Sequence, residues 1–322
     1  MAPLHGAILP EKEDEEKAVV QLASPESEPP SSSPGSPKHT RPALITYHDL
    51  PAWYQDNCFI ITGYRPVSNS TRACFGSWFY LHNESMNIYT HLIPCLAFLL
   101  GIWYVLQYLH ARYPSVSAGD DGLFVFFLLT ATACLGLSTA YHTLLNHSAE
   151  AERLWLRMDF VGIVVLTVGD IVSGVYMGFW CETLYRKIYW GMIASLGTVT
   201  IFILVTPWFQ GQRWRVFRTM TFVATGLTAI APLAHGICYF GWKAMVRQSG
   251  LPYYLAEGAC LVLGAVIYAT RFPESLKPGR FDIYGGSHQL FHVLVVVATV
   301  IQLVGILEAY DYNYHHRTCT AP

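Results

Sequence analysis

Residues 287–308 read SHQLFHVLVVVATVIQLVGILE. This apolar run has about the ~20 residues that a helix needs to cross the hydrocarbon core of a membrane. Its start carries His288 and His292, which lie one helical turn apart and therefore share one face of a helix. The run predicts a membrane-spanning helix with a pair of imidazoles near one membrane surface.

Six further apolar stretches of similar length precede this run. They are residues 87–109, 122–145, 158–179, 187–206, 217–240 and 253–270. The Lys and Arg residues of the chain lie outside the seven stretches or within their first two positions. A basic side chain in the middle of a bilayer is costly, so this distribution is typical of helices in lipid. The chain is therefore predicted to be an all-α membrane protein, a seven-transmembrane helix bundle.

The composition agrees with this fold class and excludes several others. Of the 322 residues, 52% are hydrophobic and only 13% are charged, whereas soluble domains carry about 25% charged residues. A disordered protein and a small disulfide-rich domain are excluded. The formal net charge of −2 offers no general attraction to nucleic acid. The eight cysteines include no CxxC pair, so they indicate no thiolate metal site.

The chain divides into four regions by composition. The first is acidic and rich in Ser and Pro and is expected to be a disordered tail, because it has little apolar surface to bury. The second is aromatic but too polar to span a bilayer, and we expect short amphipathic helices against the cytosolic membrane face; we call it the lead-in segment. The regions are the tail 1–45, the lead-in segment 46–86, the seven-transmembrane domain 87–310 and a short extracellular or lumenal tail 311–322.

The basic residues outside the spans predict the orientation. Seven spans place the two ends of the bundle on opposite sides of the membrane. The side that includes the lead-in segment carries nine Lys and Arg residues near the spans, and the other side carries six. Because basic residues favour the cytosolic side, this excess predicts a cytosolic N-terminus.

The spans also predict which histidines lie at the same depth. His91 is near the start of the first span and His142 near the end of the second, while His288 and His292 begin the seventh. An odd-numbered start and an even-numbered end lie at the same membrane surface, so these four imidazoles are level. Asp159, at the start of the third span, joins the same layer, near the cytosolic leaflet.

This layer predicts a metal centre. The i, i+4 pair His288 and His292 can reach one ion, and His142 is the natural third ligand. Three imidazoles without Cys or Met favour zinc, with a fourth position open for water. Asp159 is predicted to act on that water, and Ser138 lies one turn before His142 on the same helix face.

Several other polar residues have more than one interpretation. Glu84, Asn87 and His91 lie at helical spacing and are interpreted as support for the metal ligands or for helix packing, not as ligands. An interhelical hydrogen bond is expected for His235, near the opposite membrane surface.

Two acidic residues lie inside the predicted spans. Asp170 is about 16 Å deeper than Asp159 at 1.5 Å per residue. Asp170 and Glu257 either line a cavity or satisfy polar neighbours. The second interpretation is preferred for Asp170, and Glu257 has no evident partner.

Five segments of the chain match the pattern of a known family: Leu50–Pro66, Glu84–His91, Cys134–Ser148, Met158–Ile163 and Arg271–His292. On these segments the chain resembles the adiponectin receptor and hemolysin III group, the progestin and adipoQ receptors, and in particular their fungal branch. The resemblance covers about residues 47–310. It implies a seven-helix barrel with a cytosolic N-terminus, zinc held by His142, His288 and His292, Asp159 acting through water, and a lipid-filled cavity. Asp170 stands where the family pattern leads us to expect a small or apolar residue.

The family is associated with ceramide hydrolysis and with lipid and zinc metabolism. The resemblance therefore implies a ceramidase-like activity: a metal-activated water would hydrolyse the amide of a ceramide-like lipid to a sphingoid base and a free fatty acid. The alternative is a signalling receptor in which zinc is a structural staple, so the sequence leaves open whether the chain is an enzyme. A protein ligand or signalling partner is possible but unspecified. We expect an integral membrane protein of the plasma membrane or endoplasmic reticulum.

Overall fold

The computed structural model describes residues 43–209 and 212–319. Within them, seven helices are long and apolar enough to span a membrane, which confirms the predicted fold class and makes the chain a multi-pass membrane protein. The expectation for the tail 1–45 falls outside the described residues except for residues 43–45. The spanning helices are α2 (Ser85–Arg112), α3 (Ala118–Leu144), α4 (Ala149–Gly178), α5 (Thr183–Val205), α6 with α7 (Arg215–Leu227 and Ile230–Phe240), α9 (Leu251–Thr270) and α10 (Ser287–His316).

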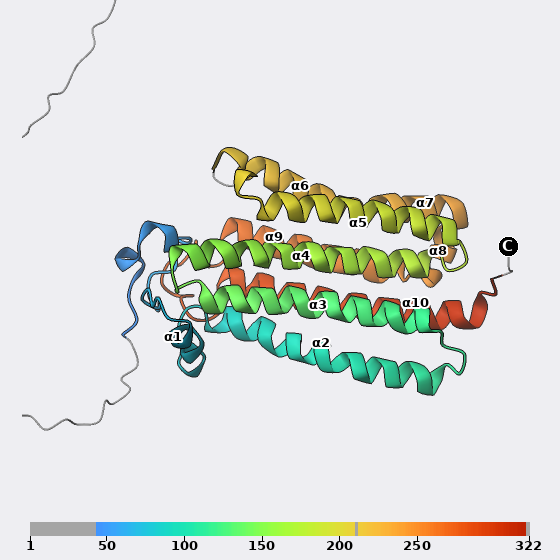
Figure 1. The fold of residues 1–322 in the computed structure, drawn as a ribbon, viewed down its shortest axis with the longest axis horizontal. Coiled ribbons are helices and arrows are strands. Elements are labelled where there is room, and N and C mark those ends of the chain that lie inside the picture. Colours follow the sequence, from blue (N-terminus) through green and yellow to red (C-terminus); the bar gives the residue numbers. More distant parts are fainter. Residues whose placement is uncertain (1–42, 210–211, 320–322) are drawn as a thin grey trace, which may run out of the picture. The chain divides into compact units, whose positions relative to one another are not determined.

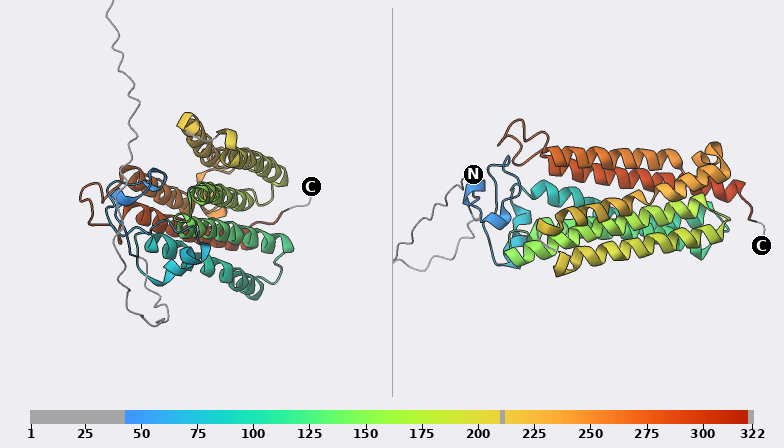
Figure 2. Two further views of the ribbon diagram at one scale, coloured as in Figure 1. Left: turned by 60° about the vertical axis from the view of Figure 1, so that its left-hand side comes forward. Right: turned by 90° about the horizontal axis from the view of Figure 1, so that it is seen from above.

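The helices run back and forth, and most sequence neighbours pack against each other (Figure 1). Helix α3 packs between α2 and α4, and α5 packs on the far side of α4. Helix α10 lies along α9 and also contacts α2 and α4 (Figure 2). The first and last spans are thus neighbours. Because α3 also packs against α2, the start of α10 lies close to the end of α3.

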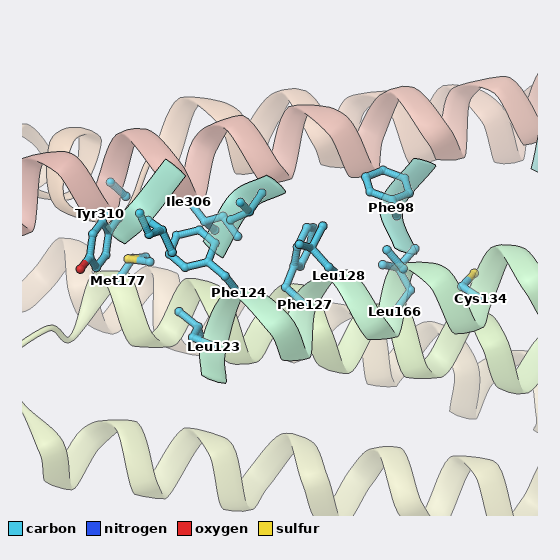
Figure 3. Packing of buried hydrophobic residues seen from close by; sticks show 14 of the residues in the cluster. Phe98, Leu123, Phe124, Phe127, Leu128, Cys134, Leu166, Met177, Ile306 and Tyr310 are labelled. Carbon is cyan, nitrogen blue, oxygen red and sulfur yellow. The ribbon is translucent and has the colours of Figure 1, made fainter. Parts of the chain in front are cut away.

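The centre of the bundle is packed with aromatic and aliphatic side chains from four helices. Phe98 comes from α2, Phe124 from α3, Leu166 from α4 and Tyr310 from α10, and all are buried (Figure 3). Burying such side chains against protein contributes about 1.5–3 kcal/mol each relative to water; for helices already in lipid, close packing is the main gain. This core extends along α3 from Leu123 to Leu135, two turns before His142.

The fifth span differs from the single apolar stretch predicted for residues 217–240. It is divided into α6 and α7, which are separated by Thr228 and Ala229. Pro232 lies in the first turn of α7. A proline has no N–H to donate and clashes with the carbonyl four residues earlier, so a continuous helix through this position is disfavoured.

The lead-in segment folds onto one end of the bundle. It contains α1 (Thr71–Gly76) and three short 3-10 helices, η1 (Tyr47–Asp49), η2 (Ala52–Tyr54) and η3 (Ser77–Phe79). Its chain is anchored to the loop before α10, because the carboxylate of Asp282 accepts hydrogen bonds from the backbone N–H groups of Ile61 and Thr62 at 3.0 and 2.8 Å. The lead-in segment is therefore built into the protein at the end where α10 begins.

A disulfide between Cys181 and Cys319 lies at the other end of the bundle. It joins the connection after α4 to the segment after α10, and Arg317 adds an ion pair with Glu182 at 2.9 Å. Helix α10 continues to His316, well into the region 311–322 that was expected to be a short tail. The short helices η4 (Pro207–Phe209), η5 (Gln212–Trp214) and α8 (Trp242–Gln248) complete the described elements.

Candidate metal centre

Three imidazoles meet at the end of the bundle that carries the lead-in segment. One ligand atom from each of His142, His288 and His292 lies within 4.8 Å of the others. Their ring centroids are 4.7–4.8 Å apart, and His142 and His292 are almost fully buried. We call these three residues the imidazole cluster. It has the donor set of a three-histidine metal site. Among the described residues, it is the one group of His, Cys, Asp or Glu side chains that could hold a metal ion.

The two ligands on α10 are placed by the way that this helix begins. Ser287 is its first residue, and its backbone N–H donates to Glu274 at 2.8 Å. The Ser287 hydroxyl also donates to the same carboxylate. A carboxylate bound to the free N–H groups of a first turn stabilises the helix start. Glu274 thereby fixes the turn that carries His288.

Two histidines of the imidazole cluster form a hydrogen bond through Nδ1. The Nδ1–H group of His142 donates to the carboxylate of Glu84 at 2.7 Å, and that of His292 donates to the carbonyl oxygen of Asn87 at 3.1 Å. Nε2 of His142 is buried without a hydrogen-bond partner among the described residues. A lone pair held in this way is what a metal ligand requires, so the residues fit a bound ion.

Glu84 is negatively charged in this arrangement. Burial alone would raise its pKa, but the hydrogen bonds from His142 and Asn87, together with the interaction with the imidazole of His142, lower the pKa of Glu84 to about 2. The Asn87 amide donates to the same Glu84 oxygen at 2.6 Å. A charged acceptor on Nδ1 makes the opposite nitrogen of His142 a better donor to a metal.

Arg65 fixes the backbone of the helix end that carries His142. Its guanidinium is fully buried and donates to the carbonyl oxygens of His142 at 2.6 Å and Thr143 at 3.0 Å, and to the Ser77 hydroxyl at 2.8 Å. The last carbonyls of a helix have no partners within it, and a cation there also interacts favourably with the helix dipole. Sequence reasoning missed this role, although Arg65 lies in one of the matching segments.

His91 does not join the imidazole cluster. Its ring stacks on His292, with centroids 3.7 Å apart and an interplanar angle of 7°. Both of its ring nitrogens are buried without hydrogen-bond partners among the described residues. The geometry is that of a packing residue behind a ligand, one of the two interpretations that the sequence allowed.

Asp159 and Ser138 lie next to the imidazole cluster but outside it. The Asp159 carboxyl is close enough to interact with His142 and with the Ser138 hydroxyl. Ser138 is buried on α3. Both residues thus lie beside His142, and their chemical roles remain predictions.

His235, the other histidine within the predicted apolar stretches, lies at the opposite end of the bundle, as predicted. The Tyr189 hydroxyl on α5 and Nδ1 of His235 on α7 are 2.9 Å apart, which confirms the expected interhelical hydrogen bond. The residue that sequence reasoning left without a partner, Glu257, interacts with Asp170. No motif indicates this pair, because its members lie 87 positions apart.

Comparison with known proteins agrees with the family that the sequence resembles. The family profile described as haemolysin-III related matches residues 79–303. The chain is 38% identical over 279 residues to an adiponectin receptor protein of Drosophila melanogaster, a match that covers 86% of this chain and 62% of the relative. It is 36% identical over 269 residues to the ADIPOR-like receptor IZH2 of Saccharomyces cerevisiae, with 83% and 84% covered. A progestin and adipoQ receptor-like protein of Caenorhabditis elegans is 34% identical over 95% of this chain and 69% of the relative.

Proposed function

The chain belongs to the haemolysin-III-related family, and on this premise we propose that it is a zinc-dependent hydrolase of the amide bond in a ceramide-like membrane lipid. The observation that carries the proposal is the buried imidazole cluster with a carboxylate and a hydroxyl beside it. Metal-dependent hydrolysis needs these parts: ligands that leave a coordination position open, a proton acceptor and a hydrogen-bond donor for the developing oxyanion.

Zinc is the metal that this donor set favours. Three neutral imidazoles are typical of catalytic zinc sites, and the imidazole cluster includes no thiolate or thioether. Bound there, zinc acts as a Lewis acid and makes water acidic near neutral pH. The hydrogen bonds of His142 to Glu84 and of His292 to the Asn87 carbonyl engage Nδ1 of each ring, so Nε2 is the nitrogen that would hold the ion.

The side chains next to the ion carry out the proton transfers. Asp159 accepts a proton from the attacking water, whose oxygen then bonds to the amide carbonyl carbon. The Ser138 hydroxyl donates to the oxygen that becomes negative. The C–N bond then breaks, the amine leaves with a proton returned by Asp159, and the products are a fatty acid and a sphingoid base.

Two features support a cytosolic site. The basic residues favour the cytosol for the end that carries the lead-in segment. The disulfide of Cys181 and Cys319 lies at the opposite end, and disulfides persist in the lumen or outside the cell. The substrate would then enter from the inner leaflet of the plasma membrane or the cytosolic leaflet of the endoplasmic reticulum.

The experiment is hydrolysis of a ceramide by the purified, zinc-loaded protein. We expect turnover by the wild type and a loss of about 10²–10⁴-fold in Asp159→Asn, the range typical of a general base. The matched control is Glu150→Gln, which changes an exposed carboxylate at the start of α4. Full turnover in Asp159→Asn with zinc still bound would remove Asp159 from the reaction.

The second candidate is a receptor in which zinc is a structural staple. The imidazole cluster joins α3 to α10, and the lead-in segment packs over the same end. A bound ion would therefore stabilise this end of the bundle whether or not it reacts. Purified zinc-loaded protein that is more stable than the metal-free form, but hydrolyses no ceramide, would favour the staple.

A further inference from the structure

A second cluster of polar side chains lies inside the bundle, remote from the metal centre. Asp170 is eleven residues along α4 from Asp159, about 16 Å at 1.5 Å per residue. Its side chain lies close enough to that of Glu257 on α9 for the two carboxyl groups to interact. We call these two residues the acid pair. Glu257 is buried, with 6% of its surface exposed, and neither residue takes part in the metal chemistry proposed above.

The acid pair has no cation to balance it. Neither carboxyl forms an ion pair within residues 43–209 and 212–319. The titratable groups that face it are Tyr254 on α9, Cys260 on α9 and Cys134 on α3, and none of them is a base. Two ionised carboxylates in contact in an apolar interior would repel each other strongly.

The geometry itself requires a proton. An ionised carboxylate has only acceptor atoms, so two carboxyl groups can form a hydrogen bond only when one of them is protonated. Oδ1 of Asp170 is buried and accepts no hydrogen bond from the described side chains and backbone groups. A proton on the neighbouring Glu257 carboxyl would supply the missing donor.

A third side chain supplies independent evidence for a polar site. Gln302 on α10 is fully buried, and both atoms of its amide lack hydrogen-bond partners in the described part of the chain. The amide lies beside the Tyr254 hydroxyl, which is itself close to the acid pair. Neutral dipoles of this kind stabilise a single negative charge, the charge of an acid pair that holds one proton.

Backbone contacts show that α9 and α4 meet at this point. The Tyr254 hydroxyl donates to the carbonyl oxygen of Asp170 at 3.1 Å. The approach depends on Gly174, because a Cβ at this position would lie 1.8 Å from the Tyr254 oxygen. The acid pair is thus part of a close polar contact between two spans.

We propose that Asp170 and Glu257 form a proton-binding site inside the membrane-spanning bundle, in which the Glu257 carboxyl donates its proton to Asp170 and joins α9 to α4. Loss of this proton leaves two facing negative charges and weakens the contact between the helices. Raising the pH until both carboxyls are ionised therefore lowers the stability of the folded protein.

The test combines infrared spectroscopy with thermal unfolding of the full-length protein in detergent micelles. We expect the wild type to show the carbonyl absorption of a protonated carboxylic acid at neutral pH, and Glu257→Gln to lose it. The matched control, Glu308→Gln, alters an exposed carboxylate on α10 and retains the band. The melting temperature of the wild type should fall as the pH is raised toward 10, whereas Asp170→Asn, which mimics a neutral acid, should show a smaller fall.

Two results would overturn the proposal. An infrared band that is identical in the wild type and Glu257→Gln would show that no proton resides on this residue. A wild-type melting temperature raised by Na⁺ or Ca²⁺, and not raised in Asp170→Asn, would show that a metal cation occupies the acid pair instead. The substitutions are nearly isosteric, and the infrared band and the melting temperature are both measured on the wild type as well. If one variant folds poorly, the measurements on the other proteins still decide.

Discussion

Nδ1 of His142 donates a hydrogen bond of 2.7 Å to Glu84, although the two residues lie 58 positions apart. The contact links the start of α2 to the end of α3. It fixes which nitrogen of His142 faces the imidazole cluster, and it places a negative charge behind that ligand. The affinity of the imidazole cluster for a metal would therefore depend on a residue outside the cluster.

Glu84→Gln should lower the affinity for zinc by about 10–100-fold, the range typical of such supporting residues. Glutamine keeps the size and offers an acceptor but removes the charge. The measurement is competition with a chelator of known affinity. Glu150→Gln serves as the control, and an unchanged zinc affinity in Glu84→Gln would show that the charge of Glu84 is irrelevant to the site.

Arg65→Met should destabilise the protein by about 3 kcal/mol, because it leaves the carbonyl oxygens of His142 and Thr143 buried without a donor, at about 1–3 kcal/mol each. Thermal unfolding of the metal-free protein measures this effect without any contribution from zinc. Arg72→Met, which changes an exposed arginine of α1, should alter the melting temperature little. Equal melting temperatures of Arg65→Met and the wild type would contradict the assigned role.

His82 should make the protein sensitive to acid. Burial and the nearby positive charge of Arg65 lower the pKa of His82 from 6.5 to about 3. As the pH falls, the unfolded chain binds a proton at His82 before the folded protein does. The contribution of the neutral His82 to folding stability is therefore complete above about pH 6.5 and is lost as the pH falls toward 3. In His82→Asn the side chain can still accept from the Glu84 N–H but cannot titrate.

The measurement is the melting temperature between pH 7 and pH 4. The slope with pH should be smaller in His82→Asn than in the wild type, while His48→Asn, an exposed histidine, should keep the wild-type slope. Parallel curves for His82→Asn and the wild type would mean that other groups cause the acid sensitivity.

The two ends of the bundle should differ in their reactivity toward thiol reagents. Cys58 is an exposed free thiol in the lead-in segment, and Cys181 and Cys319 are disulfide-bonded at the other end. A membrane-impermeant maleimide should reach Cys181 and Cys319 from the outside of intact cells, or from the lumen of microsomes that have been opened. These two residues should react only after their disulfide has been reduced. Cys58 should react from the cytosolic side without reduction. The opposite pattern would reverse the proposed orientation.

Most of the fold could be predicted from hydropathy, because each spanning helix must satisfy its own backbone and present apolar side chains to lipid. The ends were less predictable. The apolar part of α10 ends near residue 308, yet the helix continues to His316, since interfacial turns need no apolar residues. The break between α6 and α7 follows from Pro232, whose effect a count of apolar residues does not register.

The imidazole cluster was predictable because spans alternate in direction, so depth along each span can be compared between helices. That argument places His142 level with His292, and the structure brings their ring centroids to 4.8 Å. It gives no information on which helices are neighbours. The Cys181–Cys319 disulfide and the contact of Asp170 with Glu257 depend on such neighbours, and each joins residues far apart in the chain.

The most direct test of the account is the metal content of the purified protein, measured by inductively coupled plasma mass spectrometry. We expect about one zinc ion per chain in the wild type and in His235→Ala, whose histidine lies at the opposite end of the bundle. His288→Ala should contain almost none, because two imidazoles bind zinc much more weakly than three. Equal zinc in His288→Ala and the wild type, or none in a wild type purified with zinc present, would contradict the account.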